Sequence, residues 1–178
     1  MLKDIKIGCA SSKTKYGTRL DTSIVKLEKK AIWSGLFTSN KFKSAPVEIC
    51  LEKMNKNISE PKVFMVNAGN ANAATGKKGK KDSEKLIEDV SSLLNVSKDN
   101  ILPFSTGVVG ELLDTKKLSQ AFKKCTNKLG KNSWEDFANA IMTTDTRHKV
   151  VKKEFKLGSQ KINVIGVAKG VGMIEPNM

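Results

Sequence analysis

Residues 62–76 read Lys-Val-Phe-Met-Val-Asn-Ala-Gly-Asn-Ala-Asn-Ala-Ala-Thr-Gly. The apolar run from Lys62 to Asn67 is short and ends in polar residues, which predicts a buried strand. Gly69 then opens a cluster of small residues and asparagines that continues to Gly76, and such residues favour a loop. Loops at strand ends often carry binding and catalytic groups. We therefore expect this loop to form a wall of a functional site.

Strands and helices are interleaved on both sides of this segment. Apolar residues at period two indicate strands, and those at helical spacing indicate helices. The interleaving predicts an α/β, or α+β, fold with helices layered against sheet. With 178 residues, of which 39% are hydrophobic, the chain can form one domain, residues 1–178, or half of an obligate assembly. The predicted strands are 24–38, 46–51, 62–67, 153–157 and 161–167, the last two joined in a hairpin at Gly158 and Ser159, and the predicted helices are 82–94, 115–130 and 133–141.

The chain is strongly basic, with a formal net charge of +14 and a pI near 9.7. Such a charge favours nucleic-acid binding in general. However, Arg19 and Arg147 are the only arginines among 32 basic residues, and recognition of bases and phosphates favours guanidinium groups. Aromatic residues are 6% of the chain and are not interleaved with basic ones. We therefore expect no nucleic-acid partner, and we read the basic tract 76–81 as a flexible solvated loop.

Membrane, metal and disulfide chemistry find little support in the composition. No apolar run approaches the ~18 residues of a membrane span, and the first residues lack a secretory apolar region, so we expect a cytoplasmic protein without membrane contact. Cys9, Cys50 and Cys125 are odd in number and far apart, which predicts buried thiols rather than disulfides or a zinc site. His148 is the only histidine, so a multi-histidine metal site built from this chain alone is excluded. We expect no metal and no bound cofactor.

Ser105-Thr106-Gly107 lies between two short apolar runs. Glycine allows the backbone to approach a ligand with its N–H, and a neighbouring hydroxyl adds a second donor. Two such donors can form an oxyanion hole, which stabilises a tetrahedral acyl intermediate. Taken alone, however, the triplet reads as an ordinary turn.

A second candidate is the hydroxyl-rich run Thr143-Thr144-Asp145-Thr146, after the third predicted helix. Its side chains can bond their own backbone or hold the carboxylate and amine of an amino acid. Lys169 lies at a strand end before Gly170, where it is either a surface charge or an anchor for a substrate carboxylate. The residues alone favour the structural reading for the hydroxyl run and leave both readings of Lys169 open.

Five motifs in series then resemble one enzyme family. They are Phe37-Thr38-Ser39-Asn40 followed by Ala45-Pro46-Val47; the Asn-rich loop 66–73; residues 105–111; residues 142–146; and Lys169-Gly170-Val171-Gly172-Met173-Ile174-Glu175-Pro176-Asn177-Met178. In this order they span nearly the whole chain and resemble the self-processing ornithine acetyltransferase / glutamate N-acetyltransferase family. In the family the last motif continues beyond the point where this sequence stops, so we read Met178 as a cut end.

The resemblance implies a layered helix-sheet-sheet-helix sandwich, in which this chain is the N-terminal, or α, part and a β chain from the same precursor completes the fold. It also implies self-cleavage at an Ala-Thr bond, with the nucleophilic threonine two positions beyond Met178, and a pair of αβ heterodimers. By the same resemblance, Thr106 and Gly107 form the oxyanion hole, and Thr146 and Lys169 bind substrate.

The implied activity moves an acetyl group from N-acetylornithine to glutamate in arginine biosynthesis, and in some members acetyl-CoA is a second donor. The enzyme alternative is another self-processing protein with an N-terminal nucleophile, an amidohydrolase or aminopeptidase, with water as acceptor. The non-enzyme alternative is a basic nucleic-acid-binding domain, which rests on net charge alone.

Overall fold

A four-stranded sheet forms the centre of the computed structural model, which describes residues 2, 4–56, 60–170, 172 and 176–178. The strands lie in the order β1 (Ile5–Ala10), β2 (Thr22–Leu27), β3 (Val63–Asn70) and β4 (Ile101–Val108). β1, β2 and β3 pair antiparallel, whereas β3 and β4 are parallel. A parallel pair needs a crossover, which α2 (Gly76–Leu94) and the short 3₁₀ helix η1 (Lys98–Asn100) supply. The predicted mixed α/β class is therefore confirmed.

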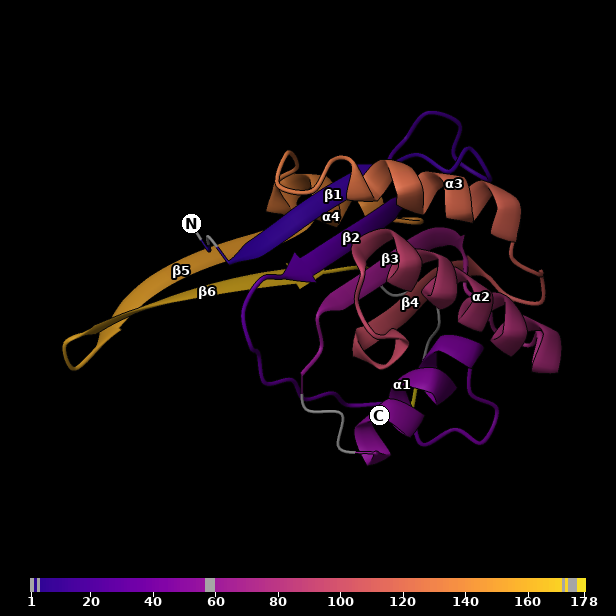
Figure 1. The fold of residues 1–178 in the computed structure, drawn as a ribbon, viewed down its shortest axis with the longest axis horizontal. Helices are drawn as coiled ribbons and strands as arrows, with labels where there is room; N and C mark the ends of the chain where they lie inside the picture. Colours follow the sequence, from indigo (N-terminus) through magenta and orange to yellow (C-terminus); the bar gives the residue numbers. More distant parts are fainter. Residues whose placement is uncertain (1, 3, 57–59, 171, 173–175) are drawn as a thin grey trace.

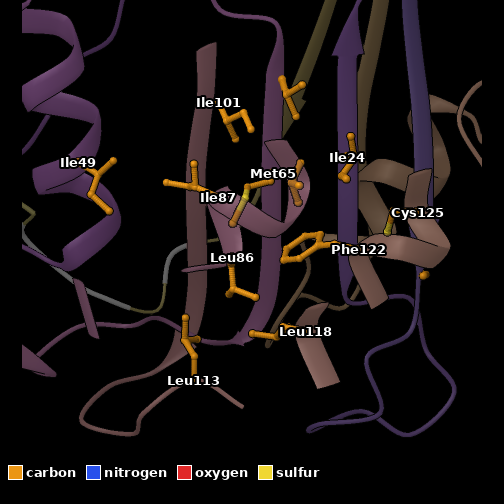
Figure 2. Packing of buried hydrophobic residues seen from close by; sticks show 13 residues of the cluster. Ile24, Ile49, Met65, Leu86, Ile87, Ile101, Leu113, Leu118, Phe122 and Cys125 are labelled. Carbon is orange, nitrogen blue, oxygen red and sulfur yellow. The ribbon is translucent and has the colours of Figure 1, made fainter. Parts of the chain in front are cut away.

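Three helices pack on one face of this sheet (Figure 1). α1 (Ala45–Asn55) contacts β4, α3 (Thr115–Thr126) contacts β1 and β2, and α2 lies between them. Phe122, at the centre of the layer, is fully buried, which contributes about 1.5–3 kcal/mol. Figure 2 shows this cluster, whose members are Ala10, Ile24, Ile49, Val63, Met65, Leu86, Ile87, Val90, Ile101, Leu113, Leu118, Phe122 and Cys125.

The opposite face of the sheet is covered only in part. α4 (Trp134–Ala140) packs against β1 and β2, where Ala140 joins a smaller cluster with Ile7, Cys9 and Val25. Over β3 and β4 the edge-on pair of Phe64 and Phe104 leaves Phe104 41% exposed. Part of an apolar sheet face is thus open to solvent.

The last two strands form a hairpin that extends away from the sheet (Figure 1). β5 (Lys149–Leu157) and β6 (Gln160–Ala168) pair antiparallel around Gly158, as predicted. Most of their residues are exposed, including Phe155 at 49% and Leu157 at 65%. A two-stranded hairpin is only marginally stable by itself in water, so these apolar side chains indicate a surface that something else covers.

The prediction of a strand at residues 46–51 was wrong, because these residues belong to α1. Pro46 occupies the first helical turn, where its missing N–H costs nothing. Ile49, Cys50 and Lys53 are buried at helical spacing, while the apparent alternation covered only three apolar positions. The buried Lys53 ammonium donates to the carbonyls of Lys98 and Ile101, at 2.5 and 2.6 Å.

Five other features of the fold differ from the prediction. The basic tract 76–81 is not a loop but the start of α2, and the Ser-Thr-Gly run of 105–107 lies inside β4 rather than in a turn. The strand expected at 24–38 ends at Leu27. β1 has no counterpart among the predicted strands, and the helix expected at 115–130 is shorter, ending at Thr126.

The start of α4 is confirmed, because the Ser133 and Asp136 side chains form the reciprocal capping box. The predicted buried thiols are confirmed as well, since Cys9, Cys50 and Cys125 are all free and buried. None of the helices in the described ranges combines the length and the apolarity that a bilayer-crossing segment requires.

Candidate functional site

Thr106 and Gly107 lie where β4 runs beside the end of β3. Thr106 pairs with Ala68 and then with Asn70, and Gly107 pairs with Gly69, so the register shifts at this point. Two side chains hold the irregularity: the Ser105 hydroxyl donates to the Asn67 side-chain oxygen at 2.6 Å, and the Asn67 amide donates to the Asn70 carbonyl at 2.9 Å. Such bulges re-aim backbone groups and are frequent beside functional sites.

Only glycine fits at position 107. Its φ is +131°, and a Cβ at this position would lie 2.3 Å from the Gly69 carbonyl carbon and 2.6 Å from the Asn70 nitrogen. Both neighbours are backbone atoms and cannot rotate away. Within the part of the chain that the structure describes, the half-buried Thr106 hydroxyl makes no hydrogen bond, so it is available to a ligand.

The asparagine loop after β3, which we predicted to be a site wall, is fixed beside this pair by hydrogen bonds. The Asn70 amide donates to the carbonyls of Glu111 and Leu112. Asn72 is fully buried, and its amide donates to the Gly79 carbonyl at 2.9 Å and to the Ser83 hydroxyl at 2.8 Å. These bonds attach the loop to the first turns of α2.

Asp145 brings the second predicted pair, Thr146 and Lys169, into one neighbourhood. Its carboxylate accepts hydrogen bonds from the Lys149 ammonium at 2.6 Å, from the Gly170 N–H, and from the Thr143 N–H at 3.3 Å. The side chain is 1% exposed. The bond from Lys149 and the backbone donors lower the pKa of Asp145 from 3.8 to about 2, so it is charged near neutral pH.

The two predicted ligand groups of this pair are free to bind. The Lys169 ammonium donates to the Gly170 carbonyl at 2.8 Å and forms no ion pair with any carboxylate in the described ranges. Thr146 is exposed, and its hydroxyl has no hydrogen-bond partner among the described residues. A half-buried ammonium that forms no ion pair with a described carboxylate can hold the carboxylate of a ligand.

A loop that the sequence prediction left out, residues 11–20, lies between the two pairs. Tyr16 and Lys15 lie against Gly69, because a Cβ there would come within 3.2 Å of each. The Arg19 guanidinium stacks 3.7 Å above the Tyr16 ring and donates to the Met142 carbonyl at 2.7 Å. The rarity of arginine in this chain was the one available signal for Arg19.

Other nucleophiles and metal ligands in the chain are poorly placed. Burial raises the pKa of Cys9 to about 11 and those of Cys50 and Cys125 to about 12, so the thiols stay protonated. His148 is exposed. Over the described part of the chain, no group of three or more His, Cys, Asp or Glu side chains is arranged to hold a metal ion.

Two hollows of the described surface lie elsewhere. One of about 220 Å³ lies between the starts of α1 and α2, and one of about 510 Å³ lies between α1, α2 and η1. Neither is lined by Thr106, Gly107, Thr146 or Lys169.

Relatives with known names match almost the whole chain. The arginine biosynthesis bifunctional protein ArgJ of Methylococcus capsulatus is 38% identical over 174 residues, which are 98% of this chain and 42% of that protein. The mitochondrial arginine biosynthesis bifunctional protein ArgJ of Candida tropicalis is 42% identical over 170 residues, which are 92% of this chain and 42% of that protein. The chain thus spans less than half the length of the curated relatives it matches.

Solved structures show the same fold. The crystal structure of arginine biosynthesis bifunctional protein ArgJ from Bacillus halodurans has a TM-score of 0.89 at 28% identity, and the match covers 98% of this chain and 91% of that chain. Ornithine acetyltransferase from Mycobacterium tuberculosis, complexed with ornithine, has a TM-score of 0.88 at 27% identity, with 97% and 91% covered. Because the ArgJ family also matches residues 6–178 in sequence, the chain belongs to the ArgJ family.

Proposed function

We propose that this chain is the α part of an acetyltransferase that moves the acetyl group of N-acetylornithine to glutamate, in arginine biosynthesis. The observation that carries the proposal is the fixed backbone of Gly107 beside the free hydroxyl of Thr106, in a chain of the ArgJ family. This pair has the two donors that an oxyanion hole needs.

Two values of sequence coverage support a partner β chain. The chain covers only 42% of the curated ArgJ protein of M. capsulatus, yet it covers 91% of the ArgJ chain in the B. halodurans crystal. A precursor that is cut into two chains accounts for both values. The open sheet face at Phe104 and the exposed apolar residues of the β5–β6 hairpin offer the surface that a second layer would cover. We propose a pair of αβ heterodimers.

The proposed chemistry begins with a threonine at the start of the β chain. Its α-amine, with an ordinary pKa of about 7.7–8.0, takes the proton of its own hydroxyl as the oxygen attacks the acetyl carbonyl carbon. The negative oxygen that forms is held by the Thr106 hydroxyl and the Gly107 N–H. When the C–N bond breaks, the ornithine amine takes the proton from the α-amine and leaves, and the acetyl group stays on the threonine as an ester.

Glutamate then reverses these steps as the acceptor. Its amine attacks the ester, its proton returns to the threonine oxygen through the α-amine, and N-acetylglutamate leaves. Thr146 and Lys169 bind the amino-acid substrate, and the Lys169 ammonium, which forms no ion pair among the described residues, holds its carboxylate. Acetyl-CoA is proposed as a second acetyl donor, and the cytoplasm as the location.

The test uses the protein expressed from its full-length gene and measured by intact mass. We expect two chains, of which the second gains one acetyl group on incubation with N-acetylornithine and loses it to glutamate. Acetate formed without glutamate dependence would favour the amidohydrolase instead. Thr106→Ala should lower kcat by about 10²–10³, since one oxyanion donor is lost.

The matched control is Thr126→Ala, which removes a threonine hydroxyl at the end of α3, outside the site. It should leave kcat unchanged. Wild-type kcat in Thr106→Ala would refute the assignment of the oxyanion hole.

A further inference from the structure

The last described residues of the chain are held by a segment that the proposed function does not use. The Asn177 carbonyl accepts hydrogen bonds from the backbone N–H and the hydroxyl of Ser39, each at 2.8 Å. The Thr38 hydroxyl donates to the preceding carbonyl, that of Pro176. Thr38 and Ser39, which we call the tail clamp, thus bind two successive carbonyls of residues 138 positions further along the chain.

The tail clamp is itself held in one conformation. The Asn40 N–H donates to the Thr38 hydroxyl oxygen at 3.1 Å, so the hydroxyl proton is directed to the Pro176 carbonyl. The Asn40 side-chain oxygen accepts a hydrogen bond from the Phe42 N–H at 2.8 Å, and the Asn40 backbone carbonyl accepts one from the Lys43 ammonium at 2.7 Å. These bonds make a turn within an otherwise irregular segment, because residues 28–44 contain no helix or strand.

The same segment is attached to the loop beside Thr106. The Ala45 N–H, at the start of α1, donates to the Asn72 carbonyl at 3.2 Å. Asn72 in turn donates its N–H to the Asn70 side chain at 2.7 Å, and Asn70 pairs with Thr106. Ser39, which bonds the Asn177 carbonyl, lies six positions before the start of α1. One series of hydrogen bonds therefore connects the tail clamp to the strand end that carries Thr106 and Gly107.

Stability of the chain does not account for these contacts. Ser39 and Asn177 are exposed, and hydrogen bonds that compete with water contribute little net free energy. Three donors that converge on two adjacent carbonyls do, however, restrict where the following peptide bonds lie. A fixed position matters most where a bond of the chain itself must react.

We propose that Thr38 and Ser39 position the bond at which the precursor cleaves itself. This inference rests on the proposed function, in which a precursor is cut into two chains, and it takes the cut to be the Ala-Thr bond that the sequence resemblance implies beyond Met178. There the threonine hydroxyl oxygen attacks the preceding carbonyl carbon, the peptide C–N bond breaks, and the nitrogen takes the hydroxyl proton. Water then hydrolyses the ester, which leaves a carboxylate on the α chain and a free threonine on the β chain. Thr38 and Ser39 are positioning residues, since they hold the carbonyls that precede this bond.

The test follows cleavage of the full-length precursor over time by intact mass. The variant Thr38→Val with Ser39→Ala removes both hydroxyl donors at nearly constant volume, and we expect cleavage about ten- to a hundredfold slower. Thr38→Ser keeps a hydroxyl and should cleave at close to the wild-type rate. Ser34→Ala is the matched control, because Ser34 is an exposed serine of the same irregular segment.

The thermal midpoint of the cleaved product separates positioning from folding. Once cleaved, the double variant should have the wild-type midpoint and transfer acetyl groups as the wild type does. Cleavage at the wild-type rate in the double variant, with acetyl transfer intact, would overturn the clamp and leave the proposed function standing. Slow cleavage of the double variant together with a lowered midpoint would also overturn the clamp if Thr38→Ser, which keeps a hydroxyl, cleaves just as slowly. A wild-type precursor that never cleaves would overturn both proposals.

Discussion

A single methyl group at position 107 should damage this protein more than the same change at a neighbouring glycine. In Gly107→Ala the new Cβ lies 2.3 Å from the Gly69 carbonyl carbon and 2.7 Å from the Gly69 Cα. Ordinary contacts begin at 3.4 Å, so the two strands must separate by about 1 Å. Both contacts are to backbone atoms, and no change of side-chain rotamer can relieve them.

The expected cost has two parts. The φ of +131° is unfavourable for alanine, which costs about 1–3 kcal/mol. The separation of β3 and β4 adds a further cost, and we expect about 2–4 kcal/mol in total. Because Thr106 and the Gly107 N–H move with the strand by about 1 Å, kcat should fall about 10²-fold.

Gly110→Ala is the matched control. Gly110 also has a positive φ, of +86°, but a Cβ there meets no atom within 4 Å. It should therefore cost only about 1 kcal/mol and leave kcat near the wild-type value. The measurements are the thermal midpoint and the acetyl-transfer rate of both variants, in protein from the full-length gene.

Two results would refute this reasoning. Equal midpoints for the two variants would mean that the close approach of Gly107 to Gly69 has no energetic weight. A lowered midpoint with wild-type kcat in Gly107→Ala would mean that the strand is important for folding but that its N–H does not act on the acyl group.

The remaining predictions concern Asp145 and the thiols. Asp145→Asn removes a charge whose pKa is lowered to about 2, and because Lys149 is 42% exposed we expect a loss of only about 1–2 kcal/mol near pH 7. A lowered pKa stabilises above the unfolded value of about 3.9, so the midpoint difference from wild type should shrink as the pH falls from about 4 to 2, and a constant difference would contradict the assignment. The three cysteines should not react with a thiol reagent at pH 8 in the folded protein, whereas all three should react in denaturant; rapid labelling of the folded protein would contradict their burial.

The errors in predicting the fold came from residues whose context outweighs their local preference. Pro103 and Gly107 both disfavour strands, so the Ser-Thr-Gly run read as a turn, but β4 is an edge strand and such strands accept proline. The lysines that open α2 gave no apolar periodicity. Gly79 and the buried Asn72 fix that first turn by a contact that sequence spacing does not reveal.

The candidate site residues could be named from the sequence, but their arrangement could not. Thr106, Gly107, Thr146 and Lys169 came from motifs, each of which is weak by itself. What joins Thr146 to Lys169 is Asp145, which bonds the Gly170 N–H 25 residues away. No pattern in the sequence specifies such a contact.

The two pairs are held by different physical means, and this makes their roles separable. Steric contact fixes the Gly107 backbone, and it does not depend on salt or pH. The neighbourhood of Thr146 and Lys169 depends on the carboxylate of Asp145 and its bond from the partly exposed Lys149 ammonium, which salt screens in part. Mild perturbation of charge should therefore raise the KM for the amino-acid substrate before kcat changes, whereas substitution at Gly107 should lower kcat first. If either the charge perturbation or the substitution at Gly107 changed KM and kcat in constant proportion, the two pairs would form one rigid unit instead of two independently supported pairs.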